Sequence, residues 1–321
     1  MCTAIHYQNG GSYFGRTLDL EYHYQEEVVV TPRQFPFAFR NGKTLQNHYA
    51  IIGMATVAEN YPLYYDAANE CGLAVAGLNF PGNARYFPPN PQKDNITPFE
   101  LIPWVLGQCK DLAQAKALLE NINLWDMPFS QEWPNSPLHW LIADKTGAIT
   151  VESVADGLKI YENPVGVLTN NPPFDYHLTN LQNYMNVTPQ EPENRSGIPD
   201  LSPYSKGMGA LGLPGDLSSA SRFVRAVFTK ANSVAGEGES ESIAQFFHIL
   251  ETVSQTRGCC RLPDGKYEIT QYTSCVHLNR GIYYYTTYEN RTICGVGLHN
   301  CPLNTGKLYQ FPLKTSPQMI I

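Results

Sequence analysis

The sequence predicts an α+β fold, in which layered sheets carry helices on their outer sides. Three observations lead to this prediction. Strand patterns occupy both ends of the chain, helical periodicity is found in two blocks between them, and neither a repeat nor a linker divides the 321 residues. We therefore expect residues 1–321 to form a single domain whose two ends belong to one system of sheets.

The N-terminal half begins with a predicted β-hairpin. Residues 3–7 and 13–19 are rich in strand-forming residues, and an Asn-Gly-Gly turn joins them. Residues 97–100 resemble a capping box with proline at the first helical position, which predicts a helix start there. The other elements expected in this half are strands at residues 27–31, 49–56 and 72–78 and a helix at residues 111–121.

The C-terminal half returns from strands to helices and back to strands. An aromatic, proline-rich stretch at residues 124–137 precedes a second hairpin, with strands predicted at 138–143 and 149–154. A short strand at 165–168 follows, and residues 188–215 form an excursion rich in proline and glycine. The remaining predictions are helices at residues 218–230 and 240–254 and strands at 267–278, 281–288, 292–298 and 308–313.

Composition argues against several classes of protein. Hydrophobic residues make up 43% of the chain and charged residues 16%, unlike a disordered sequence. The chain lacks the roughly 18 consecutive apolar residues of a membrane helix, so we expect no membrane association. A net charge of −7 without a basic stripe argues against nucleic-acid binding. The first residues lack an export signal, so we expect a cytoplasmic protein.

Cysteine and histidine usage predicts no bound metal and no other cofactor. Eight cysteines are spread along the chain without a C-x-x-C pair, so in a reducing compartment we expect mostly buried thiols rather than disulfides. His139 and His248 each lie in an apolar run, which favours core histidines with satisfied hydrogen bonds. Residues 207–212 match G-x-G-x-x-G, but no apolar strand precedes them, so dinucleotide binding is not expected.

Cys2 is the most informative single residue. A methionine before a small residue is normally removed after synthesis, which would leave Cys2 with a free α-amino group. An amine of pKa roughly 7.7–8.0 beside a thiol can take the thiol proton directly or through a water molecule. The alternative is a cysteine that merely happens to be second in the chain.

Two charged residues of the first hairpin could complete such a site. Arg16 and Asp19 are three residues apart, so they leave opposite faces of a regular strand. A bend or bulge after Arg16 would bring both to Cys2, where Asp19 would hold the amine and Arg16 would favour the thiolate. On spacing alone, a surface arginine and a strand-end aspartate are the simpler interpretation.

Three further polar residues could stabilise the negative charge that develops on a substrate oxygen during the reaction. Asn79 and Asn170 each end an apolar strand, and an amide side chain or main-chain N–H there could form an oxyanion hole. Asparagine beside proline or glycine is also an ordinary turn residue. Arg222 lies early in a predicted helix, at the positive end of the helix dipole, which weakly suggests a role outside the helix.

Motifs along the whole chain resemble the choloylglycine hydrolase family, and within it the bile salt hydrolases of gut bacteria. The resemblance implies an N-terminal-nucleophile hydrolase with an αββα four-layer sandwich, in which two antiparallel sheets lie between helix layers. The matching motifs are Met-Cys-Thr-Ala at residues 1–4, Phe-Gly-Arg-Thr-Leu-Asp at 14–19, Gly-Leu-Asn-Phe-Pro at 77–81, Leu-Thr-Asn-Asn-Pro at 168–172, Leu-Pro-Gly-Asp at 213–216 and Ala-Ser-Arg-Phe at 220–223.

The resemblance also implies roles for single residues. Cys2 would be the nucleophile with its own amine as base, Asp19 would hold the amine, and Arg16 would lie beside the thiol. The oxyanion hole would use the Asn170 side chain and the Asn79 main-chain N–H, and Arg222 would support the polar network around Cys2. The implied substrates are bile salts conjugated to glycine or taurine, in a pocket lined by Leu18, Ala58, Tyr65, Phe129, Trp133 and Leu138.

Other expectations from the resemblance concern assembly and specificity. Family members are commonly homotetramers, and residues 188–209 resemble a segment that contacts a neighbouring subunit; the alternative is a mobile surface loop. In related penicillin V acylases the position of Asn79 is typically tyrosine, so Asn79 favours bile salts. The competing functions are a penicillin V acylase or another N-acyl amino acid amidase, and a steroid-binding protein that has lost catalysis.

Overall fold

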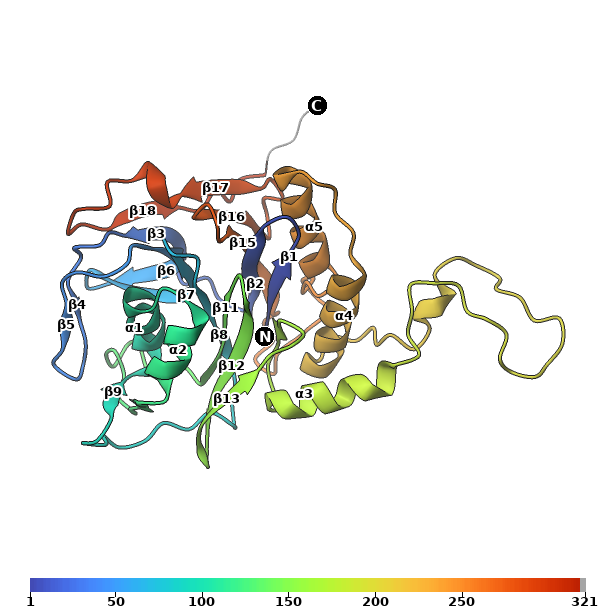
Figure 1. The fold of residues 1–321 in the computed structure, drawn as a ribbon, viewed down its shortest axis with the longest axis horizontal. Helices are drawn as coiled ribbons and strands as arrows, with labels where there is room; N and C mark the ends of the chain where they lie inside the picture. Colours follow the sequence, from blue (N-terminus) through green and yellow to red (C-terminus); the bar gives the residue numbers. More distant parts are fainter. Residues whose placement is uncertain (318–321) are drawn as a thin grey trace.

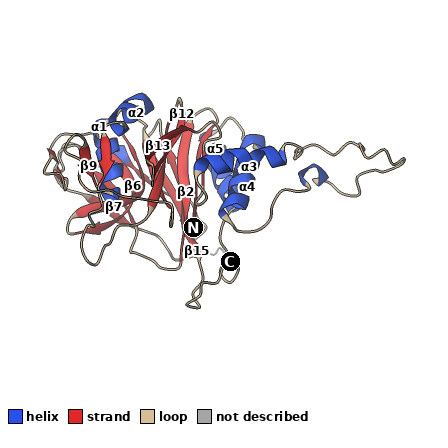
Figure 2. Ribbon diagram, turned by 90° about the horizontal axis from the view of Figure 1, so that it is seen from below, coloured by secondary structure: helices blue, strands red, loops and turns tan. Residues whose placement is uncertain are grey.

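Two antiparallel sheets face each other in the middle of the molecule, and helices cover the outer side of each sheet (Figures 1 and 2). The structure is a computed structural model that describes residues 1–317. The order of layers is helix, sheet, sheet, helix, so the predicted αββα sandwich is confirmed.

A six-stranded sheet contains both the beginning of the chain and part of its C-terminal region. Its strand order is β14-β1-β2-β15-β16-β17, which places the first hairpin at its centre. The register of β1 on β2 is continuous from Cys2 opposite Leu18 to Gln8 opposite Ser12. The strands are β1 (Cys2–Gln8), β2 (Ser12–Leu20), β14 (Val167–Leu168), β15 (Ile269–His277), β16 (Ile282–Thr287) and β17 (Cys294–Gly297).

An eight-stranded sheet forms the other central layer, with the order β13-β12-β11-β8-β7-β6-β3-β18. The strands are β3 (Glu27–Thr31), β6 (Ile51–Ala58), β7 (Tyr61–Asn69), β8 (Ala74–Asn79), β11 (Leu138–Asp144), β12 (Gly147–Val154), β13 (Gly157–Glu162) and β18 (Tyr309–Pro312). Two small two-stranded sheets lie outside it, formed by β4 (Phe37–Ala38) with β5 (Thr44–Leu45) and by β9 (Asp94–Ile96) with β10 (Ile122–Leu124).

The helices fall into the two outer layers. α1 (Leu101–Gln108) and α2 (Leu112–Leu119) pack on the eight-stranded sheet, while α4 (Ser219–Asn232) and α5 (Glu239–Glu251) pack on the six-stranded sheet. α3 (Phe174–Leu181) contacts α4. Local sequence explains the starts of two helices, because Asp111 accepts a hydrogen bond from Gln114 N and Ser218 accepts one from Ser221 N.

Two hydrophobic cores hold the layers together. One lies between the sheets and under α4 and α5, where Phe14, Phe223 and Phe246 are fully buried. The other lies between the eight-stranded sheet and α1, around the buried Trp104 and Trp140. Because both faces of each sheet are covered, β1 and β8 are buried along nearly their whole length rather than in alternate positions.

Most predicted elements are confirmed within one to three residues, but β7, β13, α3 and the short strands β4, β5, β9 and β10 were missed. β7 was not predicted because Pro62 and the polar end of the strand weaken its pattern. β13 was missed because it is only half buried. α3 was missed although Pro173 stands directly before its first residue, a common position at helix starts.

Residues 188–209 leave the layered body as an extended excursion between α3 and α4 (Figure 1). Thr188 N donates to Gly209 O at 2.9 Å, so the two ends of the excursion are held together at its base. Ile198, Leu201 and Tyr204 are exposed along it. Within residues 1–317, none of the helices is long and apolar enough to cross a membrane.

The cysteines and His248 differ from what the sequence predicts. All eight cysteines are free, as expected, but only Cys2, Cys109 and Cys275 are buried. His248 is exposed and pairs with Glu251, because it lies on the outer face of α5 although its neighbours are apolar. His139 is buried with both ring nitrogens bonded, so that prediction is confirmed.

Candidate active site

A cavity of about 550 Å³ opens beside Cys2, where the central strands of the two sheets end. Its walls are mainly apolar and aromatic, which is typical of a site for a bulky apolar ligand with few polar groups. The lining residues are Cys2, Arg16, Leu18, Leu20, Tyr24, Leu63, Tyr64, Tyr65, Gly77, Asn79, Pro98, Phe99, Phe129, Glu132, Trp133, Pro134, Asn135, Ser136 and Leu138.

The thiol side of Cys2 faces this cavity together with one face of β2. Cys2 lies opposite Leu18 in the ladder, and side chains of directly opposed residues share a face. Arg16, Leu18 and Leu20 alternate along β2 and all line the cavity. Cys2 is 2% exposed, so its thiol is shielded from bulk water.

The opposite face of β2 carries Asp19. Its carboxylate accepts hydrogen bonds from Thr17 Oγ1 at 3.1 Å and Thr270 Oγ1 at 2.7 Å, and it is fully buried. Arg16 and Asp19 therefore leave opposite faces, as their spacing predicts. The expected bend or bulge after Arg16 is wrong, because the register of β1 on β2 is unbroken and the irregularity lies in β15 between Thr270 and Tyr272.

Arg16 is fixed between the two sheets. Its Nε donates to Thr17 O at 3.1 Å, and its Nη1 donates to Tyr65 O at 3.3 Å and to Gly77 O. Nη2 is buried without a partner. Burial would lower the pKa of the Arg16 guanidinium, but nearby anionic groups, with Cys2 the largest contributor, raise it above its ordinary value, so the group stays charged.

Asn170 joins the start of β1 to the end of β8. Its Oδ1 accepts from Cys2 N at 2.9 Å, and its Nδ2 donates to Asn79 O at 2.6 Å. Phe80 N bonds to Pro137 O on the neighbouring chain segment, so the main-chain groups of Asn79 point away from β11 and towards Asn170. The two asparagines therefore meet beside Cys2.

Arg222 enters the same polar cluster from the first turn of α4. Its Nη1 donates to Cys2 O at 2.5 Å and to Thr3 Oγ1 at 2.7 Å, and its Nη2 donates to Asn170 Oδ1 at 2.7 Å. Burial lowers the pKa of this guanidinium, while Asp19 and Cys2 act in the opposite direction. Arg222 thus bonds to Cys2 and to the asparagine that contacts Cys2.

Met1 is bonded to the amide nitrogen of Cys2 and lies next to the polar cluster around that residue. Its α-amino nitrogen donates to Asp19 O at 2.6 Å and forms an ion pair with Glu268. Burial lowers the pKa of this amine, and Cys2 and Asp19 partly oppose the shift. Removal of Met1 would leave the free amine on the Cys2 nitrogen, 2.9 Å from Asn170 Oδ1.

The far walls of the cavity come from aromatic residues outside the strands, with Phe99 on a short 3-10 helix and Tyr24, Phe129 and Trp133 on loops. Phe99 and Phe129 meet edge to face with ring centroids 5.3 Å apart, and the rings of Tyr24 and Trp133 are 6.0 Å apart. Of the pocket residues expected from the sequence, Leu18, Tyr65, Phe129, Trp133 and Leu138 line this cavity. Ala58 lines a neighbouring hollow that shares Tyr24, Glu132 and Trp133 with it.

Two buried carboxylates near the site were not predicted from the sequence. Asp66 on β7 accepts from Tyr272 Oη at 2.6 Å, Ser274 Oγ at 2.9 Å and Tyr283 Oη at 2.7 Å, and thereby links the two sheets. Burial raises its pKa, and Arg16 and these hydroxyl groups oppose the shift. The other is Glu268, the partner of Met1. An acidic residue within an otherwise apolar strand was the available signal for Asp66.

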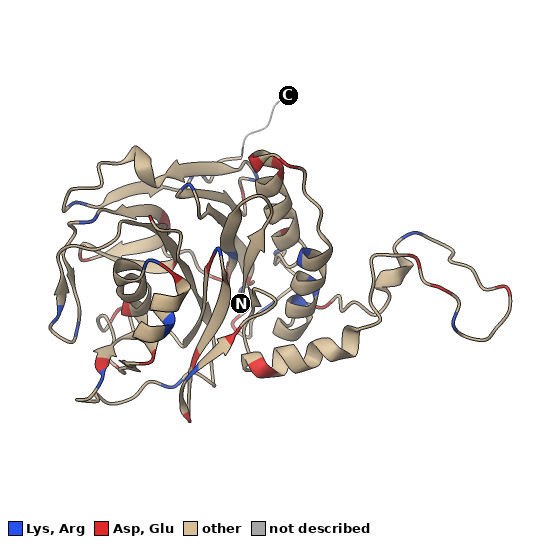
Figure 3. Cartoon of the chain, in the orientation of Figure 1, with Lys and Arg blue, Asp and Glu red and all other residues tan. Residues whose placement is uncertain are grey.

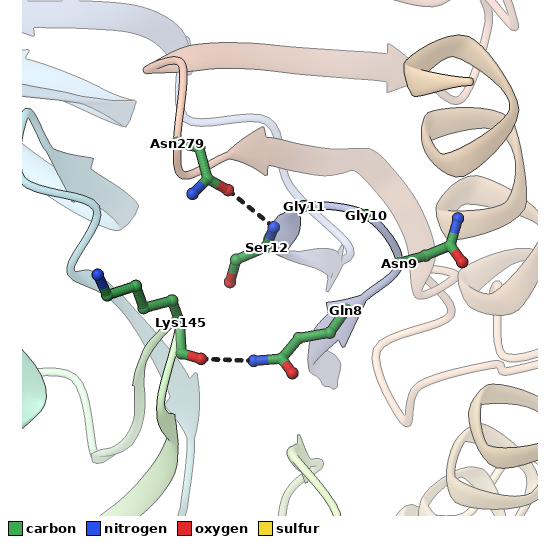
Figure 4. A pocket seen from close by; sticks show the side chains of 7 residues that line it. All are labelled: Gln8, Asn9, Gly10, Gly11, Ser12, Lys145 and Asn279. Carbon is green, nitrogen blue, oxygen red and sulfur yellow. Dashed lines mark hydrogen bonds between the residues drawn. The ribbon is translucent and has the colours of Figure 1, made fainter. Parts of the chain in front are cut away.

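A second hollow lies at the other end of the β1–β2 hairpin (Figure 4). It is open and polar, and its groups bond to one another, as Gln8 Nε2 does to Lys145 O at 2.8 Å and Ser12 N to Asn279 Oδ1 at 2.9 Å. Its lining includes none of the predicted site residues. Within residues 1–317, no group of three or more His, Cys, Asp or Glu side chains could hold a metal ion.

The fold and the site together define the class of the protein. A four-layer sandwich that places a cysteine at the start of a central strand, beside a cavity and two arginines, is that of an N-terminal-nucleophile hydrolase. Residues 2–311 match the family described as linear amide C–N hydrolases, choloylglycine hydrolase family. The chain belongs to this family and is an amide hydrolase.

Relatives and solved structures agree with this assignment. The chain is 54% identical over 319 residues to a bile salt hydrolase/transferase of Lactiplantibacillus plantarum, covering 99% of this chain and 98% of the relative. It is 39% identical to a bile salt hydrolase/transferase of Clostridium perfringens, covering 97% of each. A crystal structure of a mutant conjugated bile acid hydrolase from Clostridium perfringens superposes with a TM-score of 0.93 at 36% identity, covering 100% of this chain and 99% of that one.

A more distant structure supports the fold alone. Penicillin V acylase from Agrobacterium tumefaciens superposes with a TM-score of 0.78 at 19% identity, covering 98% of this chain and 92% of that chain.

Proposed function

We propose that this chain hydrolyses the amide bond of bile salts conjugated to glycine or taurine, with Cys2 as the nucleophile. The observation that carries the proposal is the position of Cys2. It lines a large, mainly apolar cavity and at the same time contacts Arg222 and Asn170, which belong to a polar cluster beside that cavity. A rigid apolar steroid with a short anionic tail fits such an asymmetric site.

In this proposal, removal of Met1 frees the α-amino group of Cys2, which accepts the thiol proton. Burial lowers the pKa of the Met1 amine, which directly precedes Cys2, and the same buried surroundings would favour the unprotonated form of the Cys2 amine. Arg16 on the cavity side favours the thiolate. Asp19 on the opposite face holds the amine in position.

The thiolate then attacks the carbonyl carbon of the substrate amide. The negative charge that develops on the carbonyl oxygen is stabilised by the second N–H of Asn170 Nδ2 and by the main-chain N–H of Asn79. The protonated amine gives its proton to the departing nitrogen, the C–N bond breaks, and glycine or taurine leaves. Arg222 keeps Asn170 and Cys2 in register during this step.

Water completes the cycle. The amine accepts a proton from the water molecule, whose oxygen attacks the thioester and forms a second oxyanion in the same place. Collapse of this intermediate releases the bile acid and returns the proton to the thiol. The same pair of donors therefore serves both steps, and no metal or other cofactor enters the scheme.

The alternative substrate class is a phenoxyacetyl amide such as penicillin V, because the fold is shared with a penicillin V acylase. Asn79 favours bile salts over this alternative, following the expectation that acylases carry tyrosine at the corresponding position. The cavity volume of about 550 Å³ also suits a steroid better than a single aromatic ring.

The test compares amino-acid release from glycocholate, taurocholate and penicillin V under reducing conditions. We expect rapid release from both bile salts, little from penicillin V, and none from Cys2→Ala. Intact-mass measurement of the purified protein is the accompanying control, because a retained Met1 would remove the proposed base. Release from penicillin V alone would assign the chain to the acylase activity, whereas no release by protein lacking Met1 would favour a binding protein.

We further propose a homotetramer in the cytoplasm. The excursion at residues 188–209 projects from the body and exposes Ile198, Leu201 and Tyr204, which suits a segment that packs against another subunit. A reducing compartment would keep the Cys2 thiol free, in line with eight unpaired cysteines. Figure 3 shows basic and acidic residues on many elements of the chain, in line with the net charge of −7.

A further inference from the structure

His139 and Glu152 form a fully buried pair behind the two asparagines of the site. His139 lies on β11 and Glu152 on the adjacent strand β12, and both are 0% exposed. His139 Nδ1 and Glu152 Oε1 are 2.9 Å apart. A buried ionisable pair is costly unless its hydrogen bonds are complete, so its neighbours indicate what it does.

The His139 ring contacts the chain next to both asparagines. Its plane stacks on Phe80, the residue after Asn79, with centroids 4.2 Å apart and planes at 6°. Its Nε2 lies 2.9 Å from the carbonyl oxygen of Thr169, the residue before Asn170. A single side chain therefore fixes the spacing between the ends of two strands that are not neighbours in any sheet.

The hydrogen-bond partners determine the orientation of the ring. A main-chain carbonyl can only accept, so Nε2 of His139 carries a hydrogen and donates it to Thr169 O. One further proton lies between Nδ1 and the Glu152 carboxyl group. Because both ring nitrogens are bonded, the imidazole cannot rotate without breaking two buried hydrogen bonds.

Glu152 also holds the main chain that follows Asn170. Its carboxylate accepts from Phe174 N at 3.1 Å, at the first turn of α3. His177 on that helix bonds through Nε2 to Asn170 O at 2.9 Å. Burial lowers the pKa of His177 to about 4, so its ring is neutral and Nε2 is the donor. The main chain is thus held both before and after Asn170.

We propose that His139, held by Glu152, is a positioning residue for the oxyanion hole, acting through Phe80 on Asn79 and through Thr169 on Asn170. The inference rests on the proposed function, in which these two asparagines stabilise the oxyanion. Donors must lie about 2.7–3.1 Å from the developing charge, and a displacement of about 1 Å can reduce the rate roughly 100-fold.

The first test compares two substitutions of His139. His139→Phe keeps a ring against Phe80 but loses both hydrogen bonds, and we expect kcat for glycocholate to fall roughly 10- to 100-fold while KM changes less than about 3-fold. His139→Gln can place an amide N–H near the position of Nε2 and donate to Thr169 O, so we expect it to recover a substantial part of kcat.

A second readout separates positioning from general damage to the fold. Alkylation of Cys2 by iodoacetamide, followed by peptide mass spectrometry, depends on the thiol and its amine but not on an oxyanion. We expect its rate in His139→Phe to stay within about 2-fold of that of the original protein. The aldehyde analogue of cholate, which forms an oxyanion on Cys2, should bind more weakly in proportion to the loss in kcat/KM, whereas cholate binding should not change.

The matched control is His6→Gln. His6 is a buried histidine on β1, near the turn of the first hairpin, with Nε2 2.9 Å from Ser12 Oγ, and it does not line the cavity. This variant should lower thermal stability with little change in kcat.

Three results would overturn the inference: unchanged kcat in His139→Phe, equal losses in His139→Phe and His6→Gln, or parallel losses of turnover and Cys2 alkylation in both His139 variants. The original protein is assayed beside them with glycocholate. Its inactivity would count against the proposed function, whereas full activity with unaffected variants would count against the role of His139 alone.

Discussion

Cys2 is the first residue of its strand, so its side chain and the chain end before it have different surroundings. The side chain lines the inter-sheet cavity with Arg16, while the amine of Met1 donates to the main-chain oxygen of Asp19 and pairs with Glu268. An interior strand residue offers its side chain to one face only. If Met1 is removed as proposed, Cys2 would carry its thiol on one face and a free amine at the chain end, without any distortion of the hairpin.

Arg222 permits a sharp test at the level of a single residue. Its planar group serves Cys2 O, Thr3 Oγ1 and Asn170 Oδ1 simultaneously. Arg222→Lys keeps the charge but cannot reach all three acceptors. We expect kcat to fall at least 10-fold and the free energy of unfolding to fall by about 1–3 kcal/mol, because a buried acceptor loses its partner.

Turnover of glycocholate and urea unfolding check this prediction. Arg225→Lys is the matched control, since Arg225 lies on the same helix and bonds only to main-chain oxygens of Pro214, Asp216 and Thr252. Equal activity of the two lysine variants would contradict the role assigned to Arg222.

Two buried histidines predict acid sensitivity of the fold. Burial lowers the pKa of both His6 and His177 to about 4, from 6.5 in the unfolded chain. Between these values the unfolded chain binds protons that the folded chain does not, so stability is complete above about pH 6.5 and is lost as pH falls towards 4. Each histidine contributes a loss of roughly 2 kcal/mol between pH 7 and pH 5.

Urea unfolding at several pH values between 7 and 5 measures this loss. His6→Gln removes one of the two groups and should reduce the pH dependence by about half. His248→Gln, at an exposed histidine, should leave it unchanged. A pH dependence that is the same in all three proteins would contradict the prediction.

Elements differ in how well local sequence predicts them. The first hairpin was predicted because its turn and its strand-forming residues agree, and β3 was predicted with its exact bounds. β7 was not, because its apolar residues are interrupted by Pro62 and by Asp66, whose partners come from β15 and β16. Such partners are more than 200 residues away in the chain, so no local pattern reveals them.

A close approach of two strands gives a prediction at the level of elements. Gly15 on β2 lies against β15, and a Cβ at this position would be 2.0 Å from Ser274 O. Gly15→Ala must therefore push apart the two central strands of the six-stranded sheet, next to Arg16. We expect the free energy of unfolding to fall by at least about 2 kcal/mol, with a loss of activity.

Thermal unfolding and glycocholate turnover test this expectation. Gly215→Ala is the control, because a Cβ there meets no heavy atom within 4 Å. A Gly15→Ala protein as stable as Gly215→Ala would show that β2 and β15 can separate without cost.

At the level of the whole molecule, the excursion provides a test of assembly. Its base is closed by the bond from Thr188 N to Gly209 O, so residues 191–206 can be replaced by Gly-Gly without stretching the chain between α3 and α4. We expect the shortened protein to be a folded monomer, while the full chain is a tetramer. Light scattering during gel filtration measures both, and a tetramer without the excursion would contradict the proposal.

The layers and the residues that surround Cys2 could be predicted from the sequence better than the contacts that hold those residues in place. Cys2, Arg16, Asp19, Asn79, Asn170 and Arg222 could be proposed from motifs and strand ends, and the structure places all of them around one end of the hairpin. The supports behind them, His139 and Asp66, look like core residues in the sequence. Their contacts depend on how two sheets and a helix layer come together, which is a long-range property.

The cavity is lined partly by strands and partly by segments outside the strands, and this affects how its substrate preference can change during evolution. Most groups proposed to break the bond lie on strands or on α4, and Asn170 follows two residues after β14, whereas Phe99, Phe129 and Trp133 lie outside the strands of both sheets. Loops tolerate substitution and changes of length far better than central strands do. Proteins that evolve from this chain can therefore come to accept a different bulky acyl group through mutations in these outer segments. The residues proposed to break the amide bond need not change.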